Sequence, residues 1–272
     1  MNNLFVVIVN FNNQKDIILC LQSLIKAYPK INIVVVDNAS TDNSLQSIIS
    51  LRYEKLTVIK NKKNMGFAKG ANIGIKFALK KGAERVLLLN PDTEVNKGFL
   101  EPLLLNKADI VSPIIKFKRK GQWVYDFGGK INRWLGRSYH IEDFHLGGVM
   151  ASLRSACHHP RCLPIDYISG CCMLIRRKVF DKIGLLDEKY FLFFEDVDFC
   201  LRAKKAGLKI ALEPKSMILH KLSEGKEKSL KYMYHLLKSN LIFINTWLPV
   251  YRRPIAYFYL WLLAFKILLN RL

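Results

Sequence analysis

Acidic side chains are scarce in this 272-residue chain: 22 Asp and Glu stand against 43 Lys and Arg, so the formal net charge is +21. The imbalance is strongest after residue 114, where 28 basic side chains accompany 13 acidic ones. A surface this basic suits nucleic acid, an anionic membrane or phosphorylated small molecules, and charge alone does not choose among them. Half of the residues are hydrophobic, which excludes a disordered or collagen-like chain and allows a substantial core.

The chain also has few cysteines and few long apolar runs. Six cysteines in a chain of this length do not indicate a disulfide framework, so reduced thiols and an intracellular location are expected. Residues 4–9 are apolar but have no basic segment before them, which favours a β-strand over a secretory leader. Ile255–Phe265 holds eleven uncharged residues, too few for a transmembrane helix of about 20. The segment Cys157–Cys162 contains two histidines, yet its spacing fits no common zinc module.

The first 115 residues alternate between strand and helix patterns. Continuous apolar runs typical of buried parallel strands lie at 4–9, 31–36, 56–59 and 86–89. Helical spacing or helix caps lie between them, at 14–27, 42–49 and 68–80. This order predicts a parallel sheet with helices on both faces, in which ligands bind beyond the carboxyl ends of the strands.

The remaining chain is less regular. Residues 116–163 mix charges with paired glycines, and we expect a long excursion over the sheet. Further strands are predicted at 165–176, 210–212 and 217–219, with a short helix or turn at 179–186 and a helix at 195–205. The basic and aromatic last segment, with Tyr257, Tyr259 and Trp261, predicts an interfacial rather than a membrane-spanning element.

Several polar side chains follow the predicted strands directly. Asp37 ends the second strand, which favours a ligand contact, whereas Asp42 and Ser44 are better explained as helix caps. Small residues at 66, 70, 74 and 78 would let one helix face pack closely on the sheet, but they leave Asn64 and Asn72 unexplained. Asp92 in Asn90-Pro91-Asp92 suits Mg²⁺ or Mn²⁺ as well as it suits a turn.

A second group of candidates lies late in the chain. Glu195 and Asp196 follow an aromatic run that could wall a pocket, and a partly desolvated carboxylate there can take a proton from a sugar hydroxyl. Their position at a helix start is also favoured by the helix dipole alone. Asp198 is expected to pair with Arg202 one turn on. His220 ends a strand, where the other functional ends of the sheet would lie.

Taken together, these stretches resemble a family 2 glycosyltransferase with the GT-A fold, from Phe5 to about Asn240. The resemblance is carried by six segments in order, at 7–13, 35–44, 64–74, 89–92, 169–177 and 194–202. It is nearest to the rhamnosyltransferase-like branch, which makes bacterial surface polysaccharides. It implies an α/β fold of GT-A type, a Rossmann-like, mainly parallel sheet flanked by helices, with a C-terminal basic and apolar helical extension.

The resemblance also implies roles for particular residues. Asp37 should contact the base or ribose of a nucleoside diphosphate sugar. Asp92 matches the last acid of the family's D-x-D motif and, with His220, should bind a divalent metal, Mg²⁺ or Mn²⁺. Asn90 replaces the first acid of that motif, so one clear carboxylate is left for the metal and strict metal dependence is left open. The other positions expected at the donor cleft are Val9, Asn10, Phe11, Asn38, Asn64, Gly66, Asn72 and Asn90.

The reaction implied is an inverting transfer in which Asp196 is the general base and Glu195 lies beside it. The best match for the donor is dTDP-rhamnose, and for the acceptor a glycan or a polyprenyl-diphosphate-linked glycan at the cytoplasmic membrane face. Three parts are expected: a nucleotide-sugar-binding half (1–115), an acceptor-binding and catalytic half (116–238), and a membrane-associating segment (239–272). No nucleic-acid partner is expected, and the oligomeric state is left open.

Two other function classes remain open at this stage. The charge of +21 would also suit a non-enzymatic protein that binds nucleic acid or a membrane surface. Against it, Asp37, Asp92, Glu195 and Asp196 would place negative charge in the expected cleft. A metal-dependent phosphohydrolase would need a second metal-binding carboxylate, which the sequence does not offer. The apolar C-terminus could also pack on the domain or form a dimer contact.

Overall fold

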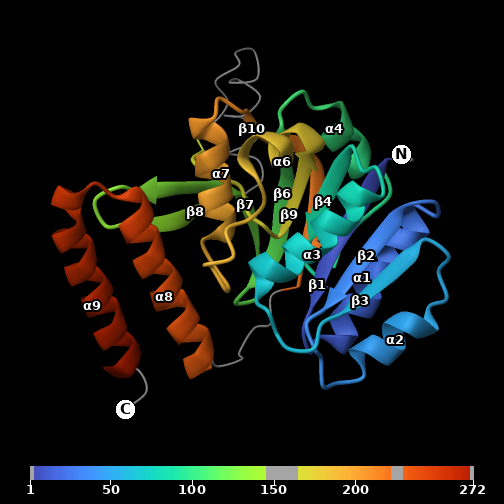
Figure 1. Ribbon diagram of the computed structural model, residues 1–272, viewed down its shortest axis with the longest axis horizontal. Helices are drawn as coiled ribbons and strands as arrows, with labels where there is room; N and C mark the ends of the chain where they lie inside the picture. The colour runs from blue at the N-terminus through green and yellow to red at the C-terminus, as the bar shows by residue number, and fades with distance from the viewer. Residues whose placement is uncertain (1–2, 145–164, 222–228, 270–272) are drawn as a thin grey trace.

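A computed structural model describes residues 3–144, 165–221 and 229–269 of the chain. Its centre is a ten-stranded sheet in the order β3-β2-β1-β4-β9-β6-β10-β5, with β7 and β8 attached beside β6 (Figure 1). The elements of the first half are β1 (Leu4–Asn10), α1 (Gln14–Ala27), β2 (Asn32–Asp37), α2 (Ser44–Ser50), β3 (Leu56–Lys60), α3 (Phe67–Lys80), β4 (Arg85–Leu89), β5 (Thr93–Glu94) and α4 (Leu100–Leu105). Each helix and long strand expected there is present.

The second half completes the sheet and ends in two helices. Its elements are β6 (Ile110–Arg119), β7 (Gln122–Asn132), β8 (Arg137–Asp143), β9 (Cys172–Arg176), α6 (Arg177–Ile183), α7 (Glu195–Lys205), β10 (Ile210–His220), α8 (Leu230–Trp247), the 3-10 turn η1 (Val250–Arg252) and α9 (Arg253–Leu269). Strands β3, β2, β1 and β4 are parallel, and β9 runs antiparallel between β4 and β6. The start of β9 and the end of β10 therefore lie at the same edge as the carboxyl ends of β1, β2 and β4.

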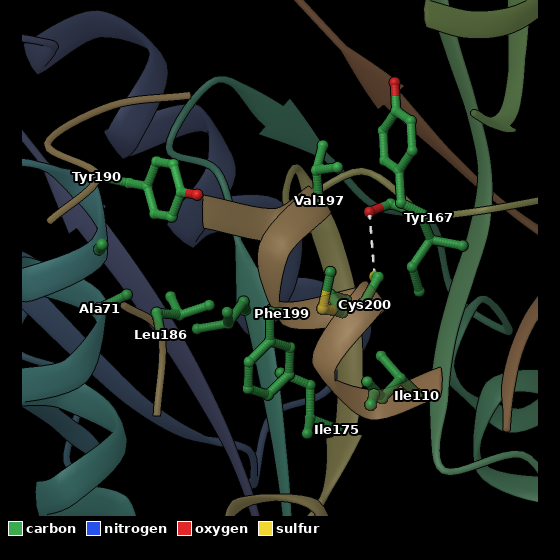
Figure 2. Packing of buried hydrophobic residues seen from close by; sticks show 14 of the residues in the cluster. Ala71, Ile110, Tyr167, Ile175, Leu186, Tyr190, Val197, Phe199 and Cys200 are labelled. Carbon is green, nitrogen blue, oxygen red and sulfur yellow. Dashed lines mark hydrogen bonds between the residues drawn. The ribbon is translucent and has the colours of Figure 1, made fainter. Parts of the chain in front are cut away.

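The sheet is covered on both faces, because its strands are apolar on both sides. In β1, Val7 and Val9 join the core beneath α3 and α7, whereas Val6 and Ile8 join the core beneath α1, α2 and α4. This alternation is the expected consequence of a strand whose successive side chains point to opposite faces. Figure 2 shows Phe199 of α7 pointing into the first of these cores.

Glycine lets α3 approach the sheet closely, as the small-residue pattern predicts. A Cβ atom at Gly74 would lie 2.5 Å from Val7 Cγ1 and 3.1 Å from Val36 Cγ2. At Gly70 it would lie 2.9 Å from Val9 Cγ1. These side chains belong to buried strands, so they have little freedom to move away.

Gly74→Ala is therefore expected to lower the free energy of unfolding by about 1–3 kcal/mol, even though alanine favours helices. Lys76→Ala in the exposed part of the same helix is the control and should leave stability nearly unchanged. Urea unfolding of both variants measures the difference. A Gly74→Ala protein as stable as the control would show that α3 does not pack on β1 as described.

Residues 116–143 are more regular than the sequence predicts. They form three strands, β6, β7 and β8, paired in antiparallel order, so the irregular excursion predicted at 116–163 is wrong for this part. The remainder, 145–164, lies outside the described residues, and with it the segment Cys157–Cys162. The strand predicted at 165–176 is shorter, because only 172–176 pairs as β9. The two strands predicted after 209 are one strand, β10, interrupted by an irregularity between Glu213 and Met217.

The C-terminal helices lie against each other beside the sheet domain (Figure 1). The inner face of α8 belongs to the main core through Phe243 and Ile244, so the boundary predicted between 238 and 239 falls inside a helix that packs on the domain. In α9, Ala256 is the buried residue. In the described part of the chain, no helix combines the length and hydropathy needed to cross a bilayer. The described cysteines, Cys20, Cys171, Cys172 and Cys200, are buried and unpaired.

Candidate active site

Backbone with positive φ occurs at the edge where the strands end, as well as at Arg52 and Lys120. Non-glycine residues with positive φ include Asn12 after β1, Ala39 after β2, and the consecutive Phe193 and Phe194 immediately before α7. Each such conformation costs free energy, and such residues gather at binding and catalytic sites because the surrounding structure holds them there. The same edge carries the polar side chains that the sequence analysis singles out.

The ends of β1 and β2 form a buried polar pair. Asn10 Nδ2 donates to Asp37 Oδ1 at 3.1 Å, and the backbone N–H of Ser40 donates to Asp37 Oδ2 at 3.0 Å. Both Asn10 and Asp37 are fully buried, while Asn10 Oδ1 has no hydrogen-bond donor among the described residues. An unpaired buried acceptor is costly, so Asn10 Oδ1 is an atom with unused hydrogen-bonding capacity at these strand ends.

The neighbouring residues differ in what they can offer. Phe11 is 44% exposed and can present its ring to a ligand. Val9 is buried, and its side chain is turned toward α3 at Gly70, which leaves its backbone for any contact. Asn64 is half-buried, and its Oδ1 accepts a hydrogen bond of 2.9 Å from the N–H of Gly66.

Asn38 and Gly66 hold loops together. Asn38 Nδ2 donates to the Gly66 carbonyl at 2.9 Å, and Asn38 Oδ1 accepts from Asn61 at 2.7 Å. Gly66 has φ +82°, and a Cβ there would lie 2.4 Å from the Phe191 carbonyl oxygen. Glycine is needed at this position because the 191–194 segment passes directly over it. Contacts of these two residues with a donor remain predictions.

The side-chain amide of Asn72 is bound within the protein. Its side chain is 2% exposed, its Nδ2 donates to the Leu186 carbonyl at 2.9 Å, and its Oδ1 accepts from the Leu186 N–H at 3.1 Å. Both ends of the amide therefore bind one backbone segment, which they fasten to α3. Its predicted contact with the donor stays a prediction.

Asp92 and His220, the two predicted metal ligands, are in contact with each other. His220 Nε2 lies 3.1 Å from Asp92 Oδ1, and residue 220 is paired with residue 93 between β10 and β5. Burial of the ring opposes protonation, but the proximity of Cys171 and Asp92 raises the pKa of His220 to about 11. Asp92 Oδ1 is therefore in contact with the imidazole of His220. A carboxylate oxygen beside an imidazole is a ligand set that a divalent cation can use in place of this ion pair.

The protein supplies few ligands of its own at this point. Within residues 3–144, 165–221 and 229–269, no group of three or more His, Cys, Asp or Glu side chains is arranged to hold a metal. Mg²⁺ and Mn²⁺ typically take one or two carboxylates together with substrate phosphates and water. Asp92 and His220 therefore fit a cation whose remaining ligands come from a bound diphosphate.

A short segment connects this pair to the candidate base. The N–H of Asn90 donates to the Cys171 carbonyl at 2.9 Å, and the N–H of Gly170 donates to Asp196 Oδ2 at 2.8 Å. A Cβ at Gly170 would lie 3.2 Å from the Asp196 Cβ. Residues 170–171 thus tie the strand end that carries Asp92 to the start of α7.

Glu195 and Asp196 are the first two residues of α7, and both carboxyl groups have a raised pKa. Burial, reinforced by the Asp196 carboxylate, raises the pKa of Glu195 well above its ordinary value. Burial also raises the pKa of Asp196, although hydrogen bonds from Gly170 and Val197 act against it. Glu195 is 6% exposed, whereas Asp196 is half-buried. Asp196 is thus the more accessible carboxylate, and a raised pKa makes it a better proton acceptor.

Asp198 has the structural role that the sequence predicts. Its Oδ2 accepts from Arg202 Nε at 2.7 Å, and its Oδ1 accepts from Trp247 Nε1 of α8 at 2.9 Å. Further contacts join α8 to the segment before α7, since His235 stacks on Phe191 with ring centroids 4.1 Å apart. Helix α8 therefore supports the loop that precedes the candidate base.

A third group, not predicted from the sequence, lies on the β7–β8 hairpin and the segment before β9. His140 Nδ1 lies 2.8 Å from Asp126 Oδ2, and the His140 ring packs edge-to-face against Tyr167 at 5.5 Å between centroids. Burial of the His140 ring lowers its pKa, whereas Asp126 and the carboxylate of Asp196 raise it. The signal for this group is the pattern Asp126-Phe-Gly-Gly followed by a histidine on the next strand.

Comparison with known proteins identifies a family. The family model described as "Glycosyl transferase family 2" matches residues 5–184. The low-salt glycan biosynthesis hexosyltransferase Agl10 of Haloferax volcanii is 31% identical over 215 residues, which cover 77% of this chain and 64% of Agl10. The N-acetylglucosaminyl-diphospho-decaprenol L-rhamnosyltransferase of Mycobacterium tuberculosis is 26% identical, over 79% of this chain and 74% of that enzyme. The chain thus spans less than two thirds of Agl10.

A solved structure agrees on the fold. The crystal structure of GalNAc-T7 with UDP, GalNAc and Mn²⁺ superposes with a TM-score of 0.72 at 19% identity. The match covers 92% of this chain and 49% of GalNAc-T7. The predicted GT-A architecture is thereby confirmed.

Proposed function

The chain belongs to glycosyl transferase family 2, and from this premise we propose that it transfers a sugar from a nucleoside diphosphate to a glycan acceptor with inversion of configuration. One observation carries the proposal. The polar strand ends Asn10 and Asp37, the pair Asp92–His220 and the carboxylate Asp196 lie along one edge of the sheet, and residues 170–171 link the last two groups.

The donor nucleoside would occupy the ends of β1 and β2. The unpaired Asn10 Oδ1 accepts a hydrogen bond from the base or ribose, and Asp37 orients the Asn10 amide through its Nδ2. Asp92 and His220 would hold a divalent cation against the diphosphate, where it supplies positive charge that stabilises the leaving group. To ligate a metal, His220 would have to be in its neutral form.

Asp196 would activate the acceptor. Its carboxylate accepts the proton of an acceptor hydroxyl as that oxygen attacks the anomeric carbon from the face opposite the diphosphate. The amides of Gly170 and Val197 fix the orientation of the carboxylate. Glu195, buried and with a strongly raised pKa, retains its proton to higher pH and so does not add a second full charge beside the base.

The donor is proposed to be dTDP-rhamnose, and the acceptor a glycan on a polyprenyl diphosphate. Support comes from the named L-rhamnosyltransferase of M. tuberculosis, whose acceptor is a decaprenol-linked sugar, and from the apolar C-terminal helices. The direct test is a thermal-shift panel of dTDP, UDP and GDP, each with and without Mn²⁺. A ligand at 100 times its Kd stabilises the fold by about 2.7 kcal/mol. A shift selective for dTDP supports this donor; a selective shift with UDP or GDP replaces it.

We further propose that α9 attaches the enzyme to the inner face of an anionic membrane. Phe258, Trp261 and Phe265 are 62%, 59% and 49% exposed and stack in a row along α9. Two exposed lysines lie near these rings: Lys238 lines one groove with Trp261, and Lys266 follows Phe265 in the chain. Aromatic rings beside basic side chains are typical of helices that lie at the headgroup level.

Replacing Phe258, Trp261 and Phe265 together by serine is expected to weaken binding to phosphatidylglycerol vesicles by more than about 10-fold, since each ring contributes apolar burial. The control is Ile49→Ser with Leu105→Ser, two exposed apolar residues on other helices, which should bind like the original protein. Sedimentation with vesicles measures the difference. Equal binding of the two variants would rule out attachment through α9.

A further inference from the structure

The hairpin of β7 and β8 carries a charged pair that no step of the proposed reaction uses. Asp126 is 5% exposed, and both of its oxygens are occupied: Oδ1 accepts from the Gly128 N–H at 2.8 Å, and Oδ2 lies 2.8 Å from His140 Nδ1. A carboxylate bound to Nδ1 fixes the orientation of an imidazole ring and the position of its proton. The side chain of His140 remains 40% exposed, so its Nε2–H is the group left for a ligand.

The backbone is shaped to bring this pair together. The pairing of β7 with β8 shifts by one residue between Asp126 and Gly129, and Gly128 within the shift has φ +87°. Such a bulge redirects side chains and recurs beside functional sites. Here it brings the carboxylate of Asp126 to the imidazole of His140 across the two strands.

Tyr167 reaches His140 across a glycine. Gly129 is paired with His140 on one side and forms a bridge to Tyr167 on the other. A Cβ at Gly129 would lie 2.2 Å from the Tyr167 ring, so only glycine lets the ring cross and meet His140 edge-to-face. The imidazole is thus held by a carboxylate at Nδ1 and by an aromatic ring at its side.

The same segment joins His140 to the candidate base. Tyr167 packs in one hydrophobic cluster with Val197 of α7 (Figure 2), and Gly170, three residues after it, donates to Asp196 Oδ2 at 2.8 Å. His140 and Asp196 also influence each other electrostatically. The segment 167–170 therefore connects the pair Asp126–His140 to the carboxylate of Asp196.

The charged groups that face His140 favour its cationic form. They are Asp126 on β7, Asp196 on α7 and Glu142 on its own strand, which is itself paired with Arg119. Partial burial opposes protonation, but these carboxylates raise the pKa of His140 above its ordinary value. An imidazolium is a strong donor to a neutral hydroxyl oxygen.

We propose that the Asp126–His140 pair forms a binding subsite for the acceptor sugar, in which Nε2–H of His140 donates to a hydroxyl neighbouring the one that Asp196 deprotonates. The inference rests on the proposed glycosyl transfer and adds a residue that selects the acceptor. It assigns His140 to binding rather than to proton transfer, because a donor aimed at the attacking oxygen would reduce its nucleophilicity.

Steady-state transfer by the full chain tests this subsite. His140→Gln is expected to raise the acceptor KM by about 10- to 100-fold, the effect of losing a hydrogen bond from a charged donor, with the donor KM close to the original value. Asp126→Asn should act in the same direction. Tyr139→Gln, an exposed neighbour on β8, is the control and should change neither constant. Thermal unfolding of each variant identifies any loss of folding.

The pH dependence separates binding from a structural effect. In the original enzyme the acceptor KM should rise as pH increases through the raised pKa of His140, because the neutral ring loses a charge-assisted hydrogen bond. This rise should be absent from His140→Gln. An unchanged acceptor KM in folded His140→Gln, with the original enzyme active, would overturn the subsite alone. Absence of transfer by the original enzyme with any sugar nucleotide would instead overturn the proposed function, and the subsite with it.

Discussion

Asp196→Asn is expected to lower the rate of sugar transfer by about 10²- to 10⁴-fold, the usual contribution of a positioned general base. The amide has nearly the shape of the carboxylate but cannot accept the acceptor proton. Binding of the nucleotide should persist, because Asn10, Asp37 and Asp92 are unchanged. Initial rates of nucleoside diphosphate release, together with nucleotide binding by calorimetry, measure the two effects separately.

Two further variants make this result decisive. Asp181→Asn removes an exposed carboxylate on α6 and should transfer sugar like the original enzyme. Glu195→Gln replaces a carboxyl group whose raised pKa favours the protonated form. Its effect on the transfer rate should therefore be smaller than the effect of Asp196→Asn. Near-normal turnover by Asp196→Asn together with loss of activity in Glu195→Gln would move the base to Glu195.

Asp92→Asn is expected to lower kcat/KM by about 10²- to 10³-fold, comparable to the loss of one group that stabilises charge in a transition state, and to abolish the response of the rate to added Mn²⁺. The reason is the scarcity of ligands: the described residues offer the pair Asp92–His220 and no larger acidic or histidine cluster. Removing the carboxylate leaves the cation dependent on one imidazole and the substrate.

The matched control is Glu94→Gln. Glu94 lies two residues further along and pairs with Lys221 instead of His220. This variant should keep its Mn²⁺ response, which is measured as the rate against metal concentration after chelator treatment. If Asp92→Asn retains the full Mn²⁺ response, the metal site is elsewhere. If the original enzyme does not respond to Mn²⁺ either, the transfer does not depend on a cation.

Local patterns were sufficient for the first half of the fold. Strands β1, β2 and β4 are continuous apolar runs, and α1 and α3 show clear helical spacing, so each was predictable to within one residue. The hairpin β7–β8 was not, because Asp126, Gly128 and Gly129 interrupt its apolar pattern. Its strand pairing depends on contacts with β6 and Tyr167 that no short window of sequence contains.

The positions of candidate site residues were predictable from the sequence where these residues lie at the ends of predicted strands. Asp37 and His220 end their strands and Asp92 follows β4, so the topology places all three at one edge of the sheet. Asn72 and His140 are the opposite case. The Asn72 amide binds the backbone of Leu186, 114 residues away, and His140 meets Asp126 through a one-residue shift in strand pairing. Both contacts join residues far apart in the sequence and depend on how the elements pack together.

The central claim is that this edge of the sheet moves a sugar from a nucleotide with inversion. The most direct measurement is NMR of the product formed from dTDP-rhamnose, or from a UDP-hexose, and a lipid-linked glycan acceptor in the presence of Mn²⁺. The account predicts a new glycosidic bond whose anomeric configuration is opposite to that of the donor, and no product with Asp196→Asn. A product that retains the donor configuration, or an enzyme that transfers no sugar from any of these nucleotides, would contradict it.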